Sequence, residues 1–205
     1  MGFSVSLRSA LIAGVLLLTS CHSALTQETV RKIRLNETTE EQIVQTYGQP
    51  KEVETIEGTG GASTIYEYRE QSGGNIGPVW WANYAILIVE LRDGRVNGYL
   101  FARTDGDSTT FDPTVSEHIV VGQTTENDLA PMLGYPHGVA MPNTQLAAFI
   151  TNVGDGETGR LAWVDAKPVT GVFNWTQLET KMLVVHIGPD GKVMDKSLRT
   201  FKVAP

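Results

Sequence analysis

Apolar residues along this chain form short runs broken by turn-forming residues, and two pairs of runs predict β-hairpins. In the first hairpin, a near-continuous apolar strand at 85–91 is followed by an Asp93-Gly94 turn and a return strand at Arg95–Arg103. In the second, strands at 182–187 and Val193–Val203 flank the turn sequence Pro189-Asp190-Gly191. Earlier alternating segments at 64–69 and 159–164 supply one more strand to each hairpin. Each half of the chain is therefore predicted to contain a three-stranded antiparallel meander.

A short amphipathic helix is predicted before each meander. In the first half, Thr38 is a candidate N-cap, and Glu41 three residues later completes a capping box. Gly48 suits the residue just past the helix end, because glycine accepts a left-handed backbone. The second half repeats this pattern from Thr124 to Gly134, with Pro131 in the helix interior, so this helix should be short or kinked. Residues 27–35 are predicted to add a leading helix to the first half.

The two halves are related by an internal repeat. Residues 38–53 match 124–139 at six positions with a constant offset of 86, and Asp93-Gly94-Arg95-Val96 recurs as Asp190-Gly191-Lys192-Val193. Two motifs in the same order in both halves indicate duplication. The predicted fold class is α+β, with two tandem domains that each pack one or two short helices on a three-stranded antiparallel meander.

The N-terminal segment has the features of a secretion signal. Arg8 is followed by an unbroken apolar run at 10–18, which is too short to span a bilayer as a helix. The run ends in Leu18-Thr19-Ser20-Cys21, and Cys21 is the single cysteine of the chain. A lone thiol has no disulfide partner in an oxidising compartment. A plain secretory signal with an incidental cysteine is the alternative interpretation.

The Leu-Thr-Ser-Cys sequence resembles the bacterial lipobox, which implies acylation of Cys21 and cleavage before it. An anchor of several acyl chains holds a protein on a membrane permanently. His22 differs from the aspartate that, in lipoproteins of this kind, usually signals retention in the inner membrane. We therefore expect an outer-membrane lipoprotein that faces the periplasm.

The repeat motif carries a second resemblance. Gly122-Gln123-Thr124 followed by Leu133-Gly134-Tyr135-Pro136 is similar to the signature of the SmpA/OmlA (BamE-like) outer-membrane lipoprotein family, and the tandem arrangement resembles β-lactamase inhibitory protein. The first copy has Asn36 where the signature has its leading glycine. These resemblances imply binding modules that stabilise a partner or block an enzyme, and none of the matched positions is catalytic. The expected organisation is a signal peptide at 1–20, a lipidated tether at 21–31, domain 1 at 32–104, a linker at 105–116 and domain 2 at 117–205.

Composition excludes several functions. The chain has a net charge of -7 and no basic stripe, which argues against nucleic-acid binding. Its four histidines have no metal-ligand spacing with one another, with Cys21 or with an acidic cluster, and no nucleophile elbow or phosphate loop is present. His186 lies on an alternating strand, where packing or hydrogen bonding is expected. We predict no catalytic residue, metal, cofactor or small-molecule substrate.

Two aromatic segments are the candidate protein-binding residues. A glycine-rich segment delivers Trp80, Trp81 and Tyr84 to the strand at 85–91, and Phe173 and Trp175 precede the corresponding strand of the second half. Such residues often anchor protein interfaces, although they also roof the cores of small domains. The expected function is binding and stabilising an envelope protein complex, such as the outer-membrane assembly machinery. The alternative is a tethered inhibitor of a periplasmic or secreted enzyme, and a lipid-anchored enzyme is a third class.

Overall fold

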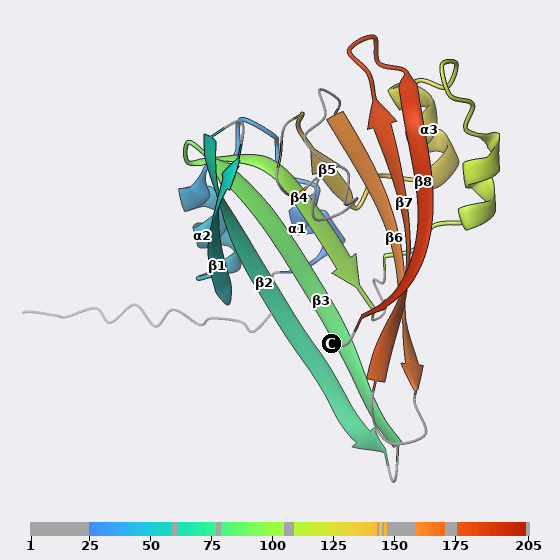
Figure 1. The fold of residues 1–205 in the computed structure, drawn as a ribbon. Coiled ribbons are helices and arrows are strands. Elements are labelled where there is room, and N and C mark those ends of the chain that lie inside the picture. The colour runs from blue at the N-terminus through green and yellow to red at the C-terminus, as the bar shows by residue number, and fades with distance from the viewer. Residues whose placement is uncertain are drawn as a thin grey trace, which may run out of the picture.

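The computed structural model describes residues 25–58, 61–76, 79–104, 109–142, 144, 146, 159–170 and 176–203. They form an α+β protein with an eight-stranded antiparallel sheet and a few short helices (Figure 1). The order of strands in the sheet follows the chain. The strands are β1 (Glu52–Gly58), β2 (Gly61–Ile76), β3 (Val79–Arg92), β4 (Arg95–Arg103), β5 (Gly138–Ala140), β6 (Gly159–Thr170), β7 (Thr176–Ile187) and β8 (Val193–Val203). The predicted signal peptide and Cys21 lie outside the described residues.

Each half contributes four strands rather than the predicted three. The additional strands, β1 and β5, are the first of each half. Three of the seven residues of β1 are glutamates, and β5 has only three residues, so neither shows a strong apolar alternation. The hairpin strands β4 and β8 have the predicted bounds. Pairing of β4 with β5 joins the halves into one sheet.

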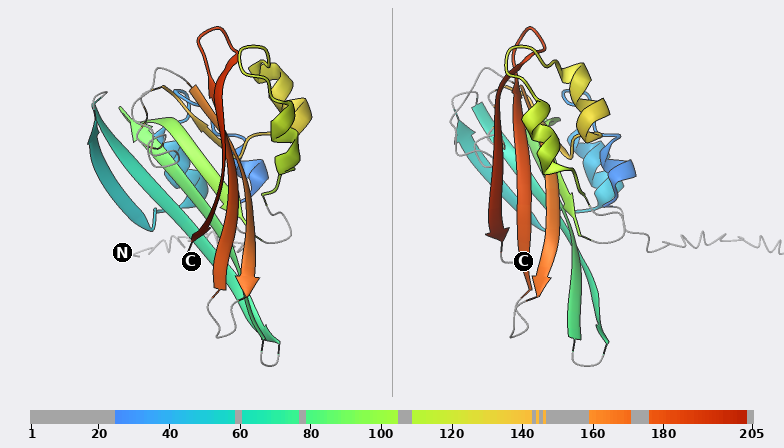
Figure 2. Two further views of the ribbon diagram at one scale, coloured as in Figure 1. Left: turned by 45° about the vertical axis from the view of Figure 1, so that its right-hand side comes forward. Right: turned by 90° about the vertical axis from the view of Figure 1, so that its right-hand side faces the viewer.

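The short helices lie on one face of the sheet, as the right-hand view of Figure 2 shows. They are α1 (Gln27–Val30), α2 (Glu40–Tyr47), the 3₁₀ helix η1 (Pro113–His118) and α3 (Glu126–Leu133). Two hydrophobic cores fill the space between helices and strands, with Ile43 of α2 central to one and Leu129 of α3 central to the other. Burial of these apolar faces stabilises helices that are too short to persist alone.

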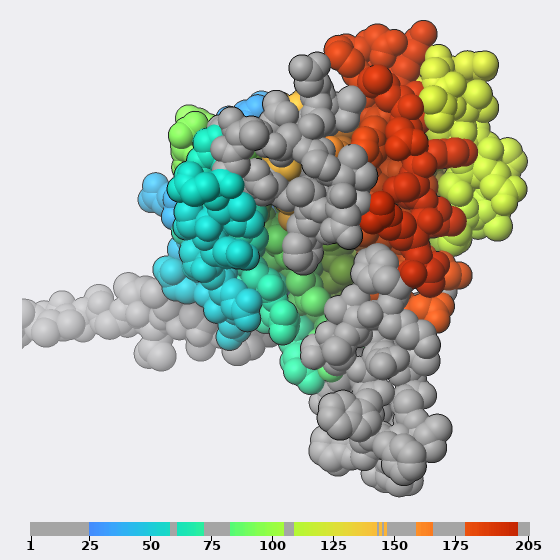
Figure 3. All heavy atoms as spheres, in the orientation of Figure 1, coloured from blue at the N-terminus to red at the C-terminus, as the bar shows by residue number. Residues whose placement is uncertain are grey.

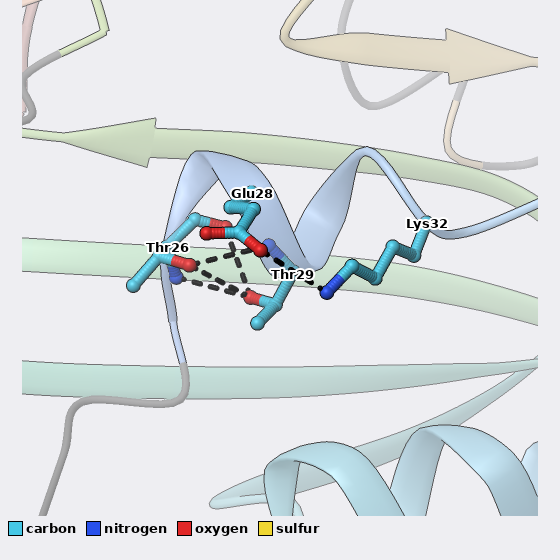
Figure 4. A network of polar contacts seen from close by, with 4 residues as sticks. All are labelled: Thr26, Glu28, Thr29 and Lys32. Atoms are coloured by element: carbon cyan, nitrogen blue, oxygen red, sulfur yellow. Dashed lines mark hydrogen bonds and ion pairs between the residues drawn. The ribbon is translucent and has the colours of Figure 1, made fainter.

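The leading helix is shorter than predicted, and it begins earlier than the predicted domain 1. In α1, Thr26 is the N-cap, and the Thr29 N–H donates to its Oγ1 at 3.2 Å (Figure 4). Lys32 pairs with Glu28 at 3.3 Å on the exposed side, beyond the end of the helix. Leu25 is already buried in the first core. The predicted tether is therefore folded onto the protein from Leu25 onward.

The helix caps lie one residue later than predicted. Thr39, rather than Thr38, caps α2, and the Thr39 N–H donates to Gln42 Oε1 at 2.9 Å. Thr38 instead accepts the Arg34 N–H on its Oγ1 at 2.8 Å. The shift arises because the Thr38 carbonyl accepts the Val96 N–H, which keeps the chain extended through Thr39. In the second half Thr125 is the N-cap in the same way.

The two halves repeat each other bond by bond. The Asn36 N–H donates to Val96 O at 2.8 Å, and the Gly122 N–H donates to Val193 O at 2.8 Å. Asn36 has a φ of 60° and Gly122 a φ of 78°. Asparagine tolerates this left-handed backbone better than most residues, which explains how the first copy lacks the leading glycine.

The predicted linker is partly structured. Its last residues form the start of η1, which Asp112 caps by accepting the Thr114 N–H at 2.9 Å. At the repeat offset, η1 corresponds to α1, and Asp112 to Thr26. The second half of the repeat therefore begins within the predicted linker, and residues 105–108 lie outside the described part.

Candidate functional site

The aromatic candidates on β3 lie toward the far end of the β2–β3 hairpin. Trp80 is paired with Asn75 and Trp81 with Gly74, close to the end of the two strands. The side chain of Tyr84 is buried, with 8% exposed, and the Tyr84 N–H donates to Thr104 Oγ1 at 2.8 Å. Little of Tyr84 is therefore available to a partner in the free protein.

The remaining predicted site residues, Cys21, Phe173 and Trp175, lie outside the described residues. The strand ends that flank the latter two are nevertheless placed, because Thr170 pairs with Thr176 where β6 ends and β7 begins. In an antiparallel meander, alternate connections lie at the same end of the sheet, so the ends of the β2–β3 and β6–β7 pairs share one end. Figures 1 and 2 show both pairs projecting there, past the end of β4.

The second face of the sheet carries an apolar row that crosses both halves. Registered pairs place Ile88 beside Leu100 and Ala162 beside Val184, with Gly138 of β5 between the two pairs. Ile88 and Leu100 are half-buried, and Ala162 and Val184 are buried. This surface, which we call the open face, lies on the side of the sheet away from α1, α2, η1 and α3 (Figure 2).

Leu146 occupies part of the open face. It comes from the β5–β6 connection, is 1% exposed and packs with Val164, Met182 and other apolar residues of β6 and β7. Its N–H donates to Glu90 Oε2 of β3 at 2.6 Å. Leu146 therefore links the second half of the molecule to the first across this face.

Glu90 is a fully buried carboxylate near the end of the largely apolar strand β3. Its Oε1 accepts the Ser63 hydroxyl at 2.8 Å and lies 3.7 Å from the Arg92 guanidinium. Burying a carboxylate is costly unless hydrogen bonds and opposite charge compensate. The contacts from Ser63, Arg92 and Leu146 supply this compensation, so Glu90 serves to hold the β5–β6 connection.

His137 lies where β4 and β6 separate beyond the short β5. Its backbone N–H donates to Ala162 O at 2.8 Å, and its carbonyl accepts the Phe101 N–H at 2.9 Å. Its ring Nδ1 accepts the Val164 N–H at 2.9 Å. Burial lowers the pKa of His137 from 6.5 to about 4, and the nearby Arg31 acts in the same direction while Asp165 opposes it. The neutral ring therefore completes the backbone pairing at the junction.

The predicted role of His186 matches its surroundings. It is half-buried on β7, between Arg160 of β6 and Asp195 of β8. Burial and the Arg160 charge lower its pKa, while Asp195 raises it. This environment is that of a packed sheet histidine.

A hollow of about 380 Å³ lies at the opposite end of the sheet from the projecting hairpins. Its lining is mostly apolar, with Leu35 and Met141 among the contributors, and Glu126 and Arg160 are the charged residues. No group of three or more His, Cys, Asp or Glu suited to a metal ion occurs within the described residues. Among the helices in the described part of the chain, none is long and apolar enough to cross a membrane.

Comparisons with known proteins add one structural likeness. No family model matches the chain, and no curated protein matches it. A crystal structure of a "putative beta-lactamase inhibitor protein" from Streptococcus mutans is similar with a TM-score of 0.47 and 11% sequence identity, over 84% of this chain and 93% of that one. This likeness assigns neither a family nor a function, so membership of the SmpA/OmlA family stays a prediction.

Sequence reasoning did not identify Glu90, His137 or Leu146 as structural contacts between the halves. A signal for Glu90 was present, because it is the single charge in an otherwise apolar run from Ala85 to Leu91. A buried position for this charge implies a nearby donor. No comparable pattern marks Leu146, whose contacts depend on how the β5–β6 connection crosses the sheet.

Proposed function

We propose that this protein is a non-enzymatic binding protein, attached by a lipid on Cys21 to the periplasmic side of the outer membrane, that holds a protein partner. The partner-binding surface in this proposal is the projecting end of the β2–β3 and β6–β7 hairpins. The continuous sheet supports it, because registered pairing of long strands gives a rigid platform.

One observation carries the proposal, namely that the two strand pairs with ends at the same end of the sheet both have uncharged, aromatic sequences there. Residues 71–89 and 168–178 contain no charged residue, and together they include Trp80, Trp81, Phe173 and Trp175. Protein interfaces are depleted in charge at their centres and enriched in Trp and Tyr. Uncharged hairpin ends with this composition are unusual on a surface exposed only to water.

Two forms of this role are consistent with the surface. In the first, the protein stabilises an envelope complex such as the outer-membrane assembly machinery. In the second, it inhibits a periplasmic or secreted enzyme, a role that a preformed sheet also suits because little ordering is needed on binding. The two forms differ in partner, a membrane complex or a soluble hydrolase.

The test is crosslinking of the full-length protein in its own envelope, followed by membrane extraction and identification of the co-purifying proteins. Outer-membrane assembly components that are lost in Cys21→Ala would support the first form, whereas a soluble hydrolase would support the second. Recovery of no specific protein would contradict the proposal.

The aromatic end is tested with Trp80→Ala/Trp81→Ala in the same experiment. We expect recovery of the partner to fall at least tenfold, because aromatic anchors at an interface centre contribute about 2 kcal/mol or more each. The matched control is Tyr135→Ala, which removes an aromatic ring that is 64% exposed just beyond α3 on the helical side. Equal recovery with all three proteins, at unchanged thermal stability, would show that the aromatic end is not the binding surface.

A further inference from the structure

The β4–β5 pairing is a joint between two copies of one repeat. At the repeat offsets, β5 corresponds to β1 and β4 corresponds to β8. The pairing of each first strand with the next strand of its own copy also matches. Glu52 pairs with Glu67 in the first copy, and Gly138, the counterpart of Glu52, pairs with Ala162 in the second. The last strand of the first copy thus pairs with the first strand of the second. The same two kinds of strand, β1 and β8, form the outer edges of the sheet.

A second molecule could in principle extend the sheet by repeating this joint, with its β1 placed on β8 of the first. Such a head-to-tail contact does not close on itself and would lead to filaments. Unpaired sheet edges are ready templates for this kind of addition. In Figure 3 the cyan surface of β1 lies toward the left of the molecule, and the red surface that includes β8 lies toward the right, beside the yellow-green helical region.

The joint itself is made of small and apolar residues. Gly98 pairs with Ala140, Tyr99 with Val139, and Leu100 with Gly138. A Cβ on Gly138 would come within 2.8 Å of Leu100 Cδ1 and 3.0 Å of Tyr99 O, and a Cβ on Gly98 within 3.3 Å of the Ala140 backbone. The close approach of β4 and β5 therefore leaves little room for a Cβ at either glycine.

The outer edges carry charged residues at the positions where the joint carries these small ones. Glu52 and Glu54 of β1 stand where β5 has Gly138 and Ala140. On β8, Asp195 stands where β4 has Gly98. A second copy docked in the joint register would place Asp195 directly opposite Glu54, and like charges in such a pair are destabilising.

We propose that these acidic residues prevent the outer edges β1 and β8 from pairing with a second copy of this chain in the way that β4 pairs with β5. Val53 is 59% exposed and Leu198 is 46% exposed, so apolar surface for such a contact is present on both edges. Lys196, at the position of Tyr99, donates from Nζ to Ser116 O and Ile119 O at 2.6 and 2.7 Å and is held by its own molecule. Charge and bulk at the joint positions thus keep the protein from polymerising.

The experiment gives each outer strand the residues of its counterpart in the β4–β5 joint, one strand per variant. One full-length variant carries Glu52→Gly/Glu54→Ala on β1, and the other carries Asp195→Gly/Ser197→Leu on β8. Each is extracted in detergent, tagged to differ in mass and analysed by native mass spectrometry, alone and mixed. When β8 of one variant pairs with β1 of the other, the substituted positions carry the residues of the β4–β5 joint on both strands, and Lys196 is the remaining difference. We therefore expect a one-to-one complex in the mixture at least tenfold above either variant alone.

The control variants keep the charge, with Glu52→Asp/Glu54→Asp on β1 and Asp195→Glu on β8, and their mixture should stay monomeric like the natural protein. A natural protein that already forms head-to-tail oligomers through these edges would overturn the proposal. So would a mixture of rebuilt variants that stays monomeric while each variant unfolds at the natural temperature.

A second variant covers the case in which a rebuilt edge does not fold. Glu54→Lys changes one exposed side chain and converts the expected Asp195–Glu54 repulsion into attraction. We expect self-association that is lost at high salt, because pairing between exposed charges is screened. Absence of self-association in this variant at low salt, with the fold intact, would likewise overturn the proposal.

Discussion

At the scale of single residues, the junction of the two halves depends on the protonation of one side chain. His137 makes three bonds to two strands, β4 and β6, through its N–H, carbonyl and ring, and only the neutral ring can accept the Val164 N–H. The junction should therefore be sensitive to acid.

We predict that stability falls as the pH is lowered from 6.5 toward 4. The pKa of His137 is about 4 in the folded protein and about 6.5 when unfolded, so the unfolded chain binds the proton first and protonation favours unfolding. Stability from this group is complete above pH 6.5, and about 3 kcal/mol is lost by pH 4. Urea unfolding at a series of pH values measures the change.

The control for this prediction is His137→Asn, whose side-chain oxygen can still accept the Val164 N–H but does not titrate. Other groups that titrate, including His186, contribute equally to both proteins. A pH dependence in His137→Asn that equals that of the natural protein would show that His137 does not control the junction.

At the scale of elements, the sequence predicted the hairpins well and the helix starts less well. The bounds of β4 and β8 follow from strong turns at Asp93-Gly94 and Asp190-Gly191, which are local signals. The shift of the caps from Thr38 to Thr39 depends on a backbone bond to Val96, far along the chain. Such a distant contact leaves no trace in the local pattern.

The turn before each main helix allows a matched comparison between the halves. We predict that Gly122→Ala destabilises the protein by about 1–2 kcal/mol, because alanine is strained at a φ of 78°. Gly122→Asn should cost much less, since Asn36 already occupies the equivalent turn of the first half. Thermal unfolding of both variants tests this, and equal losses would contradict it.

At the scale of the whole molecule, the candidate site could be predicted in part. The aromatic residues of both segments were visible in the sequence, and the strand order then placed the β2–β3 and β6–β7 strand ends at the same end of the sheet. The burial of Tyr84 and the position of Leu146 on the open face were not predictable, because both depend on packing between distant strands. The repeat itself did not reveal whether its copies share a sheet, since that depends on the three residues of β5.

We predict that the narrow joint controls cooperativity. Gly138→Ala should cost about 1–3 kcal/mol, because the added Cβ meets Tyr99 O across the joint. The loss should appear as a broader or divided thermal transition, since the joint is a main link between two separate helical cores. Gly159→Ala, whose Cβ would lie 3.8 Å from the nearest atom, is the control. A single sharp transition in both variants would show that other contacts couple the halves.

The buried position of Leu25 limits how far the protein can extend from a membrane. Its N–H donates to Glu70 at 3.4 Å and its carbonyl accepts from Arg103, so the folded body begins four residues after Cys21. Four extended residues span roughly 14 Å at most. With the lipid that we propose on Cys21, Leu25 stays within that distance of the headgroups. The protein is then held beside the bilayer by a short connection and cannot leave it to reach a partner.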